Sequence, residues 1–143
     1  MPELPEVETV RKGLEKKTQN FLIDKIEVLK ERSIASYGGS EEFKPMMLGL
    51  KIGGWKRRGK YLIAELLKES NTKGGWLVVH LRMTGQFQFH INRSDSCPHT
   101  RVRFWNPAGI ELRFVDTRNF GQMWWIPPDV LPAERIKGLS NLG

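Results

Sequence analysis

The feature that most constrains this fold is a series of short apolar segments, separated by turn residues, between residues 50 and 126. Each segment is too short for a packed helix and rich in β-branched or aromatic residues, as strands are. The strand-like segments are 50–57, 60–67, 76–81, 86–90, 101–105, 110–115 and 121–126. Turn signals at 71–75 and 106–109 separate neighbouring segments, and the second of them is typical of a hairpin. Regular short strands of this kind predict a sandwich or a barrel.

The remaining segments add helices at both ends and one more strand. Residues 4–17 predict a helix, 21–29 a half-buried strand, and 132–137 a brief helix. Ser40 is a candidate cap for a short helix that starts at Glu41. We therefore expect a mainly β fold with flanking helices: an antiparallel β-sandwich of about eight strands with an N-terminal α-helix.

The sequence predicts one domain over residues 1–137. Residues 138–143 are polar and glycine-bearing, and we interpret them as the start of an interdomain linker. The 143 residues suffice for a single domain with a hydrophobic core. No segment has the length and apolar character of a signal peptide or a membrane span, so we expect a soluble, cytoplasmic protein.

Charge and cysteine content limit the classes of partner and cofactor. The chain carries 23 Lys and Arg against 16 Asp and Glu, a net charge of +7. A basic domain favours a polyanionic partner such as nucleic acid, although many basic domains have none. Cys97 is the only cysteine, and the three histidines are widely spaced. We predict no metal site in this chain and a reducing compartment.

The first ten residues contain an unusual candidate nucleophile. Removal of Met1 would leave Pro2 with a free secondary amine, whose pKa of about 8 keeps part of it neutral near neutral pH. Its attack on an aldehyde-like carbon gives an iminium ion, and the neighbouring Glu3 carboxylate could move protons. The alternative is an ordinary helix start, with Pro5 in the first turn and acidic residues at the positive end of the dipole.

Three further motifs each allow a functional and a structural interpretation. The basic cluster 56–61 could contact phosphate or form a solvated hairpin tip. Met83, in the segment 80–85, could insert into a base stack or belong to the core. In the segment 116–121, Arg118 and Phe120 could replace a lost base pair, or an arginine–aspartate pair could brace a turn over a buried Phe120.

The segment 2–9, Pro-Glu-Leu-Pro-Glu-Val-Glu-Thr, resembles the N-terminus of formamidopyrimidine-DNA glycosylase, the bacterial repair enzyme for oxidised purines. The related endonuclease VIII enzymes typically have glycine at the position of Leu4. The motifs around Lys60, His80 and Arg118 resemble the same family, in the same order. A shorter match places His99 where the family often has a histidine.

The resemblance implies a bifunctional DNA glycosylase and apurinic-site lyase that flips an oxidised purine, such as 8-oxoguanine, out of double-stranded DNA. The implied catalytic residues are Pro2, Glu3 and Lys60, with Glu6 supporting the active site. The implied DNA-binding residues are His80, Met83, His99, Arg118 and Phe120. Met83 would fill the gap left by the extruded base, while Arg118 would pair with the opposite base.

The resemblance also implies a second half that this sequence does not contain. In the family that half carries a helix–two-turn–helix domain and a four-cysteine zinc finger, so we expect no cofactor in this chain. We expect a monomer with weak DNA affinity and little or no glycosylase turnover. A non-catalytic DNA-binding β-domain, in which the first residues only cap a helix, is the alternative function.

Overall fold

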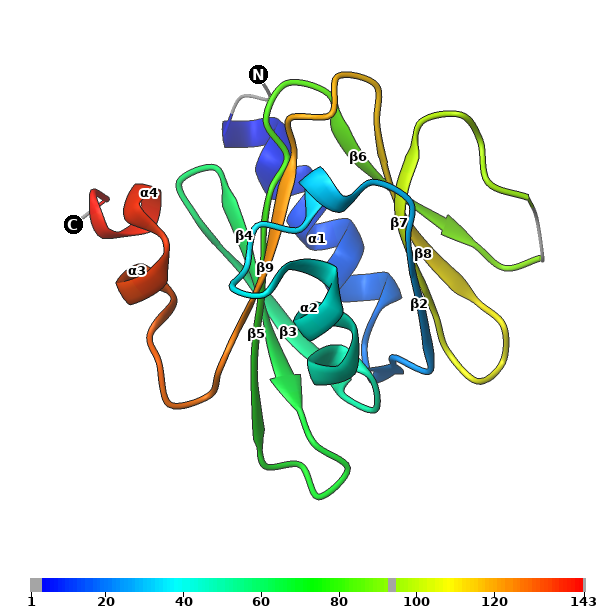
Figure 1. Cartoon of the computed structure of the whole chain (residues 1–143), viewed down its shortest axis with the longest axis horizontal. Coiled ribbons are helices and arrows are strands. Elements are labelled where there is room, and N and C mark those ends of the chain that lie inside the picture. The colour runs from blue at the N-terminus through cyan, green and yellow to red at the C-terminus, as the bar shows by residue number, and fades with distance from the viewer. Residues whose placement is uncertain (1–3, 93–94, 143) are drawn as a thin grey trace.

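The computed structural model describes residues 4–92 and 95–142, which form two antiparallel sheets and flanking helices (Figure 1). Five strands form one sheet in the order β1-β3-β4-β5-β9, and four form the other in the order β2-β7-β8-β6. The strands are β1 (Phe21–Leu22), β2 (Lys25–Val28), β3 (Lys51–Arg58), β4 (Tyr61–Leu67), β5 (Lys73–His80), β6 (Gly85–His90), β7 (Thr100–Trp105), β8 (Glu111–Asp116) and β9 (Gln122–Ile126). The fold confirms the predicted mainly β, two-sheet architecture with an N-terminal helix, and nine strands are described instead of about eight.

Helices flank the two sheets. They are α1 (Leu4–Lys17), α2 (Gly39–Met47), α3 (Pro132–Arg135) and α4 (Lys137–Ser140), and one 3-10 turn, η1 (Glu31–Ser33), precedes α2. The main core includes Phe43, Ile52, Leu77, Phe104 and Phe114, from α2 and from both sheets. Burial of these large apolar side chains is the main force that holds the two sheets together. None of the helices in the described ranges is both long and apolar enough to cross a membrane.

The prediction of one continuous strand over residues 21–29 is wrong, because the chain forms two separate strands there. The chain forms β1, which pairs with β3 in one sheet, and then β2, which pairs with β7 in the other. The switch occurs at Ile23 and Asp24, whose backbone N–H groups donate to Leu50 and Trp105 respectively, at 2.9 and 2.8 Å. Alternating polar and apolar residues indicate which side is buried, but they do not identify the strand that will be the partner.

The predicted cap of α2 is also wrong. The helix begins at Gly39, and its N-cap is Gly38 in the left-handed region at φ 82°. Ser40 lies inside the first turn, where its backbone N–H donates to the Glu31 carboxylate at 2.8 Å. The hydrogen bond from the Ser40 hydroxyl, together with this backbone bond, holds the pKa of Glu31 below its usual range. Glu31 thereby fixes η1 to the start of α2.

The C-terminal residues form two short helices instead of one. Leu139 of α4 is buried at 1% exposure, in a second apolar cluster with Ile63, Val78 and Ile136 on the outer side of the five-stranded sheet. The domain boundary at 137 and the linker at 138–143 stay predictions.

Candidate functional site

Two connections lie at the end of the molecule where α1 begins (Figure 1). One joins β5 to β6 and carries Met83, and the other joins β8 to β9 and carries Arg118 and Phe120. The backbone N–H of Arg118 donates to the Thr84 hydroxyl oxygen at 3.1 Å, so the two connections are directly bonded. The fold therefore brings together two motifs that are more than thirty residues apart in the sequence.

Asp116, the last residue of β8, organises both connections. It is 1% exposed, and its carboxylate accepts hydrogen bonds from the Thr84 hydroxyl, from Arg118 N–H at 3.2 Å and from Gly121 N–H at 2.7 Å. The side chain of Arg101 donates to the Asp116 carbonyl at 2.8 Å. One buried carboxylate thus fixes the backbone on either side of Arg118 and Phe120. The structural alternative for this motif expected an arginine–aspartate pair to brace the turn; Asp116 does brace it, but through the backbone N–H groups of Arg118 and Gly121.

We expect Asp116→Asn to destabilise the domain by about 1–3 kcal/mol, because an amide can accept on only one of its two terminal atoms. The amide nitrogen, itself a donor, would face a backbone N–H donor or the Thr84 hydroxyl. Chemical denaturation measures the difference directly. Asp129→Asn, at an exposed position, is the matched control and should change stability by less than about 0.5 kcal/mol. Equal effects of the two substitutions would contradict the role of Asp116.

Met83 and Phe120 are exposed, at 51% and 44%. These values exclude Met83 from the core and exclude the alternative in which a turn is braced over a buried Phe120. The Arg118 guanidinium lies beside both side chains, with Nη1 3.9 Å from the Met83 sulfur and Cζ 6.0 Å from the Phe120 ring centroid. The structure therefore presents a cation, a thioether and an aromatic ring together on the surface.

His80 and Lys60 lie at the same end of the five-stranded sheet. Tyr61, the residue after Lys60, is paired with His80 across β4 and β5, and the two rings meet edge to face at 4.6 Å. His80 Nδ1 accepts a hydrogen bond from the backbone N–H of Arg82 at 3.0 Å. Burial, together with the positive charges of Arg82 and Lys60, lowers the pKa of His80 to about 4. His80 is therefore neutral at pH 7, and its contact with phosphate stays a prediction.

We expect the His80 ring to titrate near pH 4 in an NMR experiment, well below the usual value of about 6.5. Because the unfolded chain binds the proton more tightly, His80 makes stability fall as the pH drops from about 6.5 to 4. His80→Gln should remove that part of the pH dependence. A His80 midpoint above pH 6 would contradict the buried, neutral ring.

Glu8 connects α1 to the hairpin that carries Lys60. Its carboxylate accepts hydrogen bonds from Arg11 at 2.9 Å and from Arg57 Nε at 3.3 Å, and Arg57 also donates to the Gly59 carbonyl at 3.1 Å. The hydrogen bonds from Arg11, with a smaller contribution from Arg57, lower the pKa of Glu8 to about 2. The first described turns of α1 are thus fixed to the turn at Gly59 and Lys60.

Of the other predicted site residues, the structure describes some and not others. Pro2 and Glu3 lie outside the described residues. Glu6 is exposed in the first turn of α1. His99 is exposed, and its carbonyl accepts the backbone N–H of Asp116 at 3.0 Å, so it lies beside the organised connections. The catalytic and DNA-binding roles of all these residues stay predictions.

Arg32, which the sequence pattern did not single out, also belongs to this surface. Its guanidinium lies over the Phe120 ring, with Cζ 5.1 Å from the centroid. A cavity of about 470 Å³ opens here, lined by Arg32, Arg82, Met83, Asn119, Phe120 and Gln122. Arg32 lies in η1, in a loop segment without periodicity, so no signal in the sequence could have identified it.

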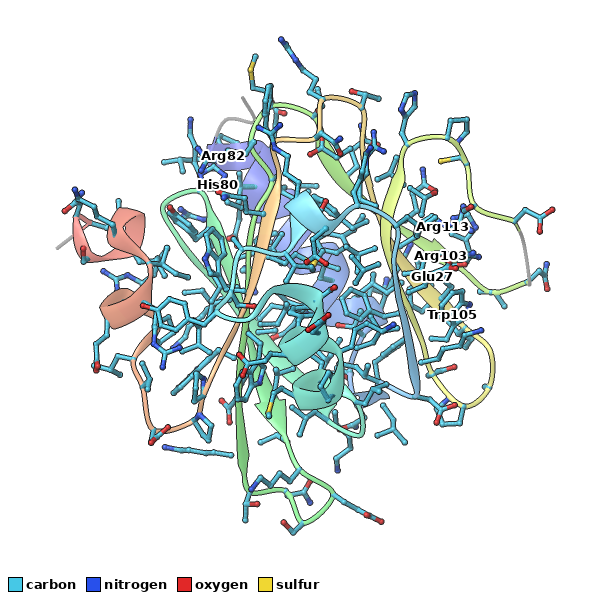
Figure 2. All side chains as sticks on the ribbon, viewed as in Figure 1. Glu27, His80, Arg82, Arg103, Trp105 and Arg113 are labelled. Carbon is cyan, nitrogen blue, oxygen red and sulfur yellow. The ribbon has the colours of Figure 1, made fainter. Side chains whose placement is uncertain are left out.

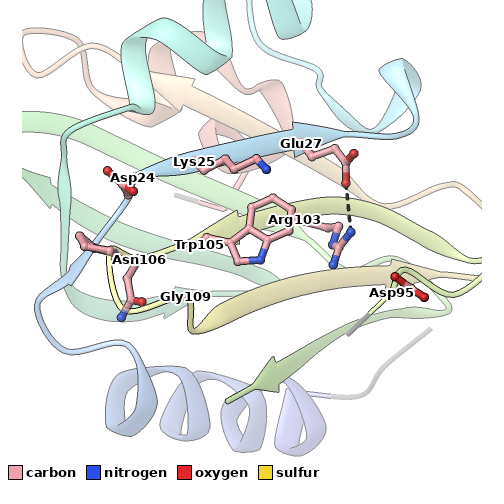
Figure 3. Close-up of a pocket in the computed structure, with 9 residues that line it drawn as sticks. Asp24, Lys25, Glu27, Asp95, Arg103, Trp105, Asn106 and Gly109 are labelled. Carbon is pink, nitrogen blue, oxygen red and sulfur yellow. Dashed lines mark hydrogen bonds and ion pairs between the residues drawn. The ribbon is translucent and has the colours of Figure 1, made fainter. Parts of the chain in front are cut away.

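A second cavity of about 470 Å³ lies on the outer face of the four-stranded sheet (Figure 3). Trp105 forms its floor, with the Lys25 Nζ 4.9 Å and the Arg103 Cζ 4.5 Å from the ring centroid. Three carboxylates, those of Asp24, Glu27 and Asp95, are among the lining residues. This cavity therefore has more acidic than basic side chains, unlike the cavity beside Phe120.

Next to this cavity, an ion-pair network covers the outer face of β7 and β8 (Figure 2). Glu111 accepts hydrogen bonds from Arg113 at 2.6 and 3.0 Å and from Arg103 at 2.8 and 3.1 Å. Burial opposes ionisation of the Glu111 carboxyl, but the two guanidiniums outweigh it and lower the pKa to about 2. The arginines of β7 and β8 thus form the polar face of a sheet, as their alternation in the sequence indicates.

The described residues offer little to a metal ion. In residues 4–92 and 95–142, no three or more His, Cys, Asp or Glu side chains gather into a group that could hold one. The only cysteine, Cys97, has its sulfur 3.1 Å from the Thr100 hydroxyl. With one cysteine, these 143 residues cannot by themselves form a four-cysteine zinc finger.

The fold and this surface define a class: a basic two-sheet β domain whose loops present cations and an aromatic ring at one end, as in nucleic-acid-binding domains. The family follows from comparison with known proteins. The family model described as formamidopyrimidine-DNA glycosylase N-terminal domain matches residues 1–123, and the chain belongs to this family. The resemblance read from the sequence is thereby confirmed.

Curated relatives of the chain include formamidopyrimidine-DNA glycosylases of Prochlorococcus and Parasynechococcus. The chain is 65% identical over 147 residues to that of Prochlorococcus marinus strain MIT 9211, covering 100% of this chain and 51% of the relative. It is 57% identical over 143 residues to that of Parasynechococcus marenigrum strain WH8102, covering 100% and 50%. The chain thus spans about half the length of the curated relatives it matches.

Solved structures with the same fold include complexes of Lactococcus lactis Fpg with DNA. One complex contains N7-benzyl-Fapy-dG DNA; its TM-score is 0.79 at 35% identity, covering 90% of this chain and 45% of that protein. Another contains abasic-site DNA, with a TM-score of 0.79 at 34% identity and the same coverage.

Proposed function

We propose that this chain is the catalytic N-terminal domain of a bifunctional DNA glycosylase and apurinic-site lyase. Its substrate class is double-stranded DNA with oxidised purines, such as 8-oxoguanine and formamidopyrimidines, or with abasic sites. The observation that carries the proposal is the exposed group of Met83, Arg118 and Phe120, fixed by the buried Asp116 at the end where α1 begins. The Fapy-dG and abasic-site DNA in the relative's complexes supports the same substrate class.

In the proposed reaction, the Pro2 nitrogen attacks C1′ of the damaged nucleoside, the C1′–base bond breaks, and the proton that the Pro2 nitrogen loses leaves with the base. The Glu3 carboxyl protonates the sugar ring oxygen, the ring opens, and an iminium ion links C1′ to Pro2. The iminium is an electron sink, so loss of a C2′ proton expels the 3′-phosphate, and a second elimination expels the 5′-phosphate. Hydrolysis of the iminium then frees the enzyme.

The described residues would prepare the DNA for this chemistry. Lys60 would hold a phosphate close to the lesion, and the Glu8–Arg57 ion pair would keep the Lys60 turn close to the start of α1. Met83 and Phe120 would fill the space left by the flipped base, which offsets an unstacking cost of a few kcal/mol. Arg118 would donate hydrogen bonds to the orphaned base. Glu6 would support the lesion pocket, and His80 and His99 would contact the backbone.

The test is to incubate residues 2–143, with Met1 removed so that the Pro2 nitrogen is free, with abasic duplex DNA and borohydride, which reduces an iminium to a stable amine. We expect a covalent protein–DNA adduct but slow release of 8-oxoguanine, because the chain spans half of its relatives. Salt-dependent DNA binding without any adduct would instead support the non-catalytic DNA-binding domain. We propose that the chain acts as a monomer, which sedimentation with and without DNA would establish.

A further inference from the structure

The cavity beside Phe120 is lined by positive side chains that no acidic residue among its described lining residues balances. Among the described residues that line it, Arg32 and Arg82 are basic and none is acidic. Within residues 4–92 and 95–142, Arg32 makes no ion pair. The equally large cavity over Trp105 has three carboxylates, so the basic character is specific to the cavity beside Phe120. A positive hollow of this kind favours an anionic ligand.

The two cations of this cavity are held on rigid supports. η1 is fixed on one side by the Glu31–Ser40 bond and on the other by the Ala35 N–H, which donates to the Met123 carbonyl of β9 at 2.8 Å. The Arg82 guanidinium donates to the Gln122 side chain at 2.6 Å. The backbone that carries Arg32 is therefore fixed, and the exposed Arg32 guanidinium lies above one face of Phe120, in the same cavity as Arg82.

We propose that Arg32, supported by the positive charge of Arg82, is a binding subsite for a DNA backbone phosphate. The phosphate lies next to Phe120, which acts as a wedge when its ring enters the DNA. The proposal rests on the proposed function, in that Phe120 enters DNA. A DNA strand carries a phosphate at every base step, so a strand opened by Phe120 offers phosphates to Arg32, which lies over the Phe120 ring. Toward residues 4–92 and 95–142 the Arg32 guanidinium donates no hydrogen bond, so its N–H groups can bind that phosphate, and guanidinium–phosphate hydrogen bonds are short and strong.

A purely structural role for Arg32 is the competing explanation. In that case the guanidinium would do no more than hold the Phe120 ring in its orientation. Such a role would change DNA affinity without changing its dependence on salt. A phosphate contact releases condensed counterions, so its loss reduces the salt slope by about 0.9 in log K against log salt. The salt slope therefore separates the two explanations.

The experiment measures binding of the 143-residue chain to a duplex with a reduced abasic-site analogue, by fluorescence anisotropy across a salt series. We expect Arg32→Gln to weaken binding about 5- to 10-fold at 0.1 M salt and to lower the slope by about 0.9. Arg135→Gln is the matched control, because Arg135 Cζ also lies over an aromatic ring, that of Tyr37, at 4.3 Å. It should leave the slope unchanged, and thermal melts should show both variants folded.

A methylphosphonate scan then identifies the phosphate. When a single uncharged linkage replaces the phosphate that Arg32 binds, the wild type and Arg32→Gln should bind equally well. An unchanged slope for Arg32→Gln, or equal slope losses for Arg32→Gln and Arg135→Gln, would overturn the subsite while leaving DNA binding intact. If the wild type itself showed no salt-dependent binding, the proposed function would fail together with the subsite.

Discussion

Replacement of Glu111 by glutamine should destabilise the domain by about 3–5 kcal/mol, the largest stability effect we expect from a single substitution. The Glu111 side chain is 3% exposed and lies between Arg113 and Arg103, which are 4% and 12% exposed. Without the carboxylate, two nearly buried guanidiniums would face a neutral amide. For a chain of this size, the loss corresponds to a melting temperature lower by roughly 10–15 °C.

The matched control is Glu65→Gln, because Glu65 is an exposed strand residue of β4. That substitution should change stability by less than about 0.5 kcal/mol. Thermal and urea unfolding of both variants would measure the difference. Equal stabilities for Glu111→Gln and Glu65→Gln would show that the network contributes nothing to the fold.

The same network gives a pH dependence with a definite sign. Because the folded pKa of Glu111 is about 2 and its ordinary value is 4.5, the folded state favours the ionised carboxylate. Its contribution to stability is complete above pH 4.5 and is lost as the pH falls towards 2. Glu8 is shifted in the same direction and acts over the same window. In Glu111→Gln, stability should fall less steeply between pH 4.5 and 2 than in the wild type.

Retention of Met1 should abolish the borohydride-trapped adduct, the largest effect on activity that we expect. A methionine before Pro2 converts the secondary amine to a tertiary amide, which has no nucleophilic lone pair. Loss of a nucleophile costs orders of magnitude in rate, so the adduct should fall by more than about 100-fold. The comparison needs two preparations of the same chain, one with and one without Met1, distinguished by intact mass.

Binding to abasic DNA is the control for this comparison. Met1 leaves the net charge and every described side chain unchanged, so we expect both preparations to bind with similar affinity and salt dependence. Similar adduct yields from the two preparations would contradict the assignment of Pro2 as the nucleophile. Loss of both binding and adduct would instead indicate that Met1 blocks access of the DNA.

The main architecture could be predicted because the apolar pattern of each element is local. The helix over residues 4–17 and the hairpin around 106–109 have the expected bounds within a residue or so, since amphipathic spacing and turn residues determine them. The division of 21–29 between two sheets could not be predicted. It depends on which distant strands, β3 and β7, present free edges at that point.

The candidate site shows the same limit. The motifs around Met83 and Phe120 are recognisable as sequence strings, but their joint dependence on Asp116 becomes visible only when Thr84 and Gly121 are seen on the same carboxylate. Arg32 is a further case, because its relation to Phe120 arises from η1 lying beside β9. Contacts between loops depend on the whole fold, so a local pattern does not determine them.

The most direct measurement is the location of the borohydride-trapped adduct on the polypeptide. After reduction of residues 2–143, which begin with a free Pro2, on abasic DNA, nuclease and protease digestion followed by mass spectrometry would identify the modified peptide. We expect the added sugar fragment on the N-terminal peptide, at the nitrogen of Pro2. An adduct on a lysine such as Lys60, or no adduct from a chain with a free Pro2, would contradict the proposed chemistry.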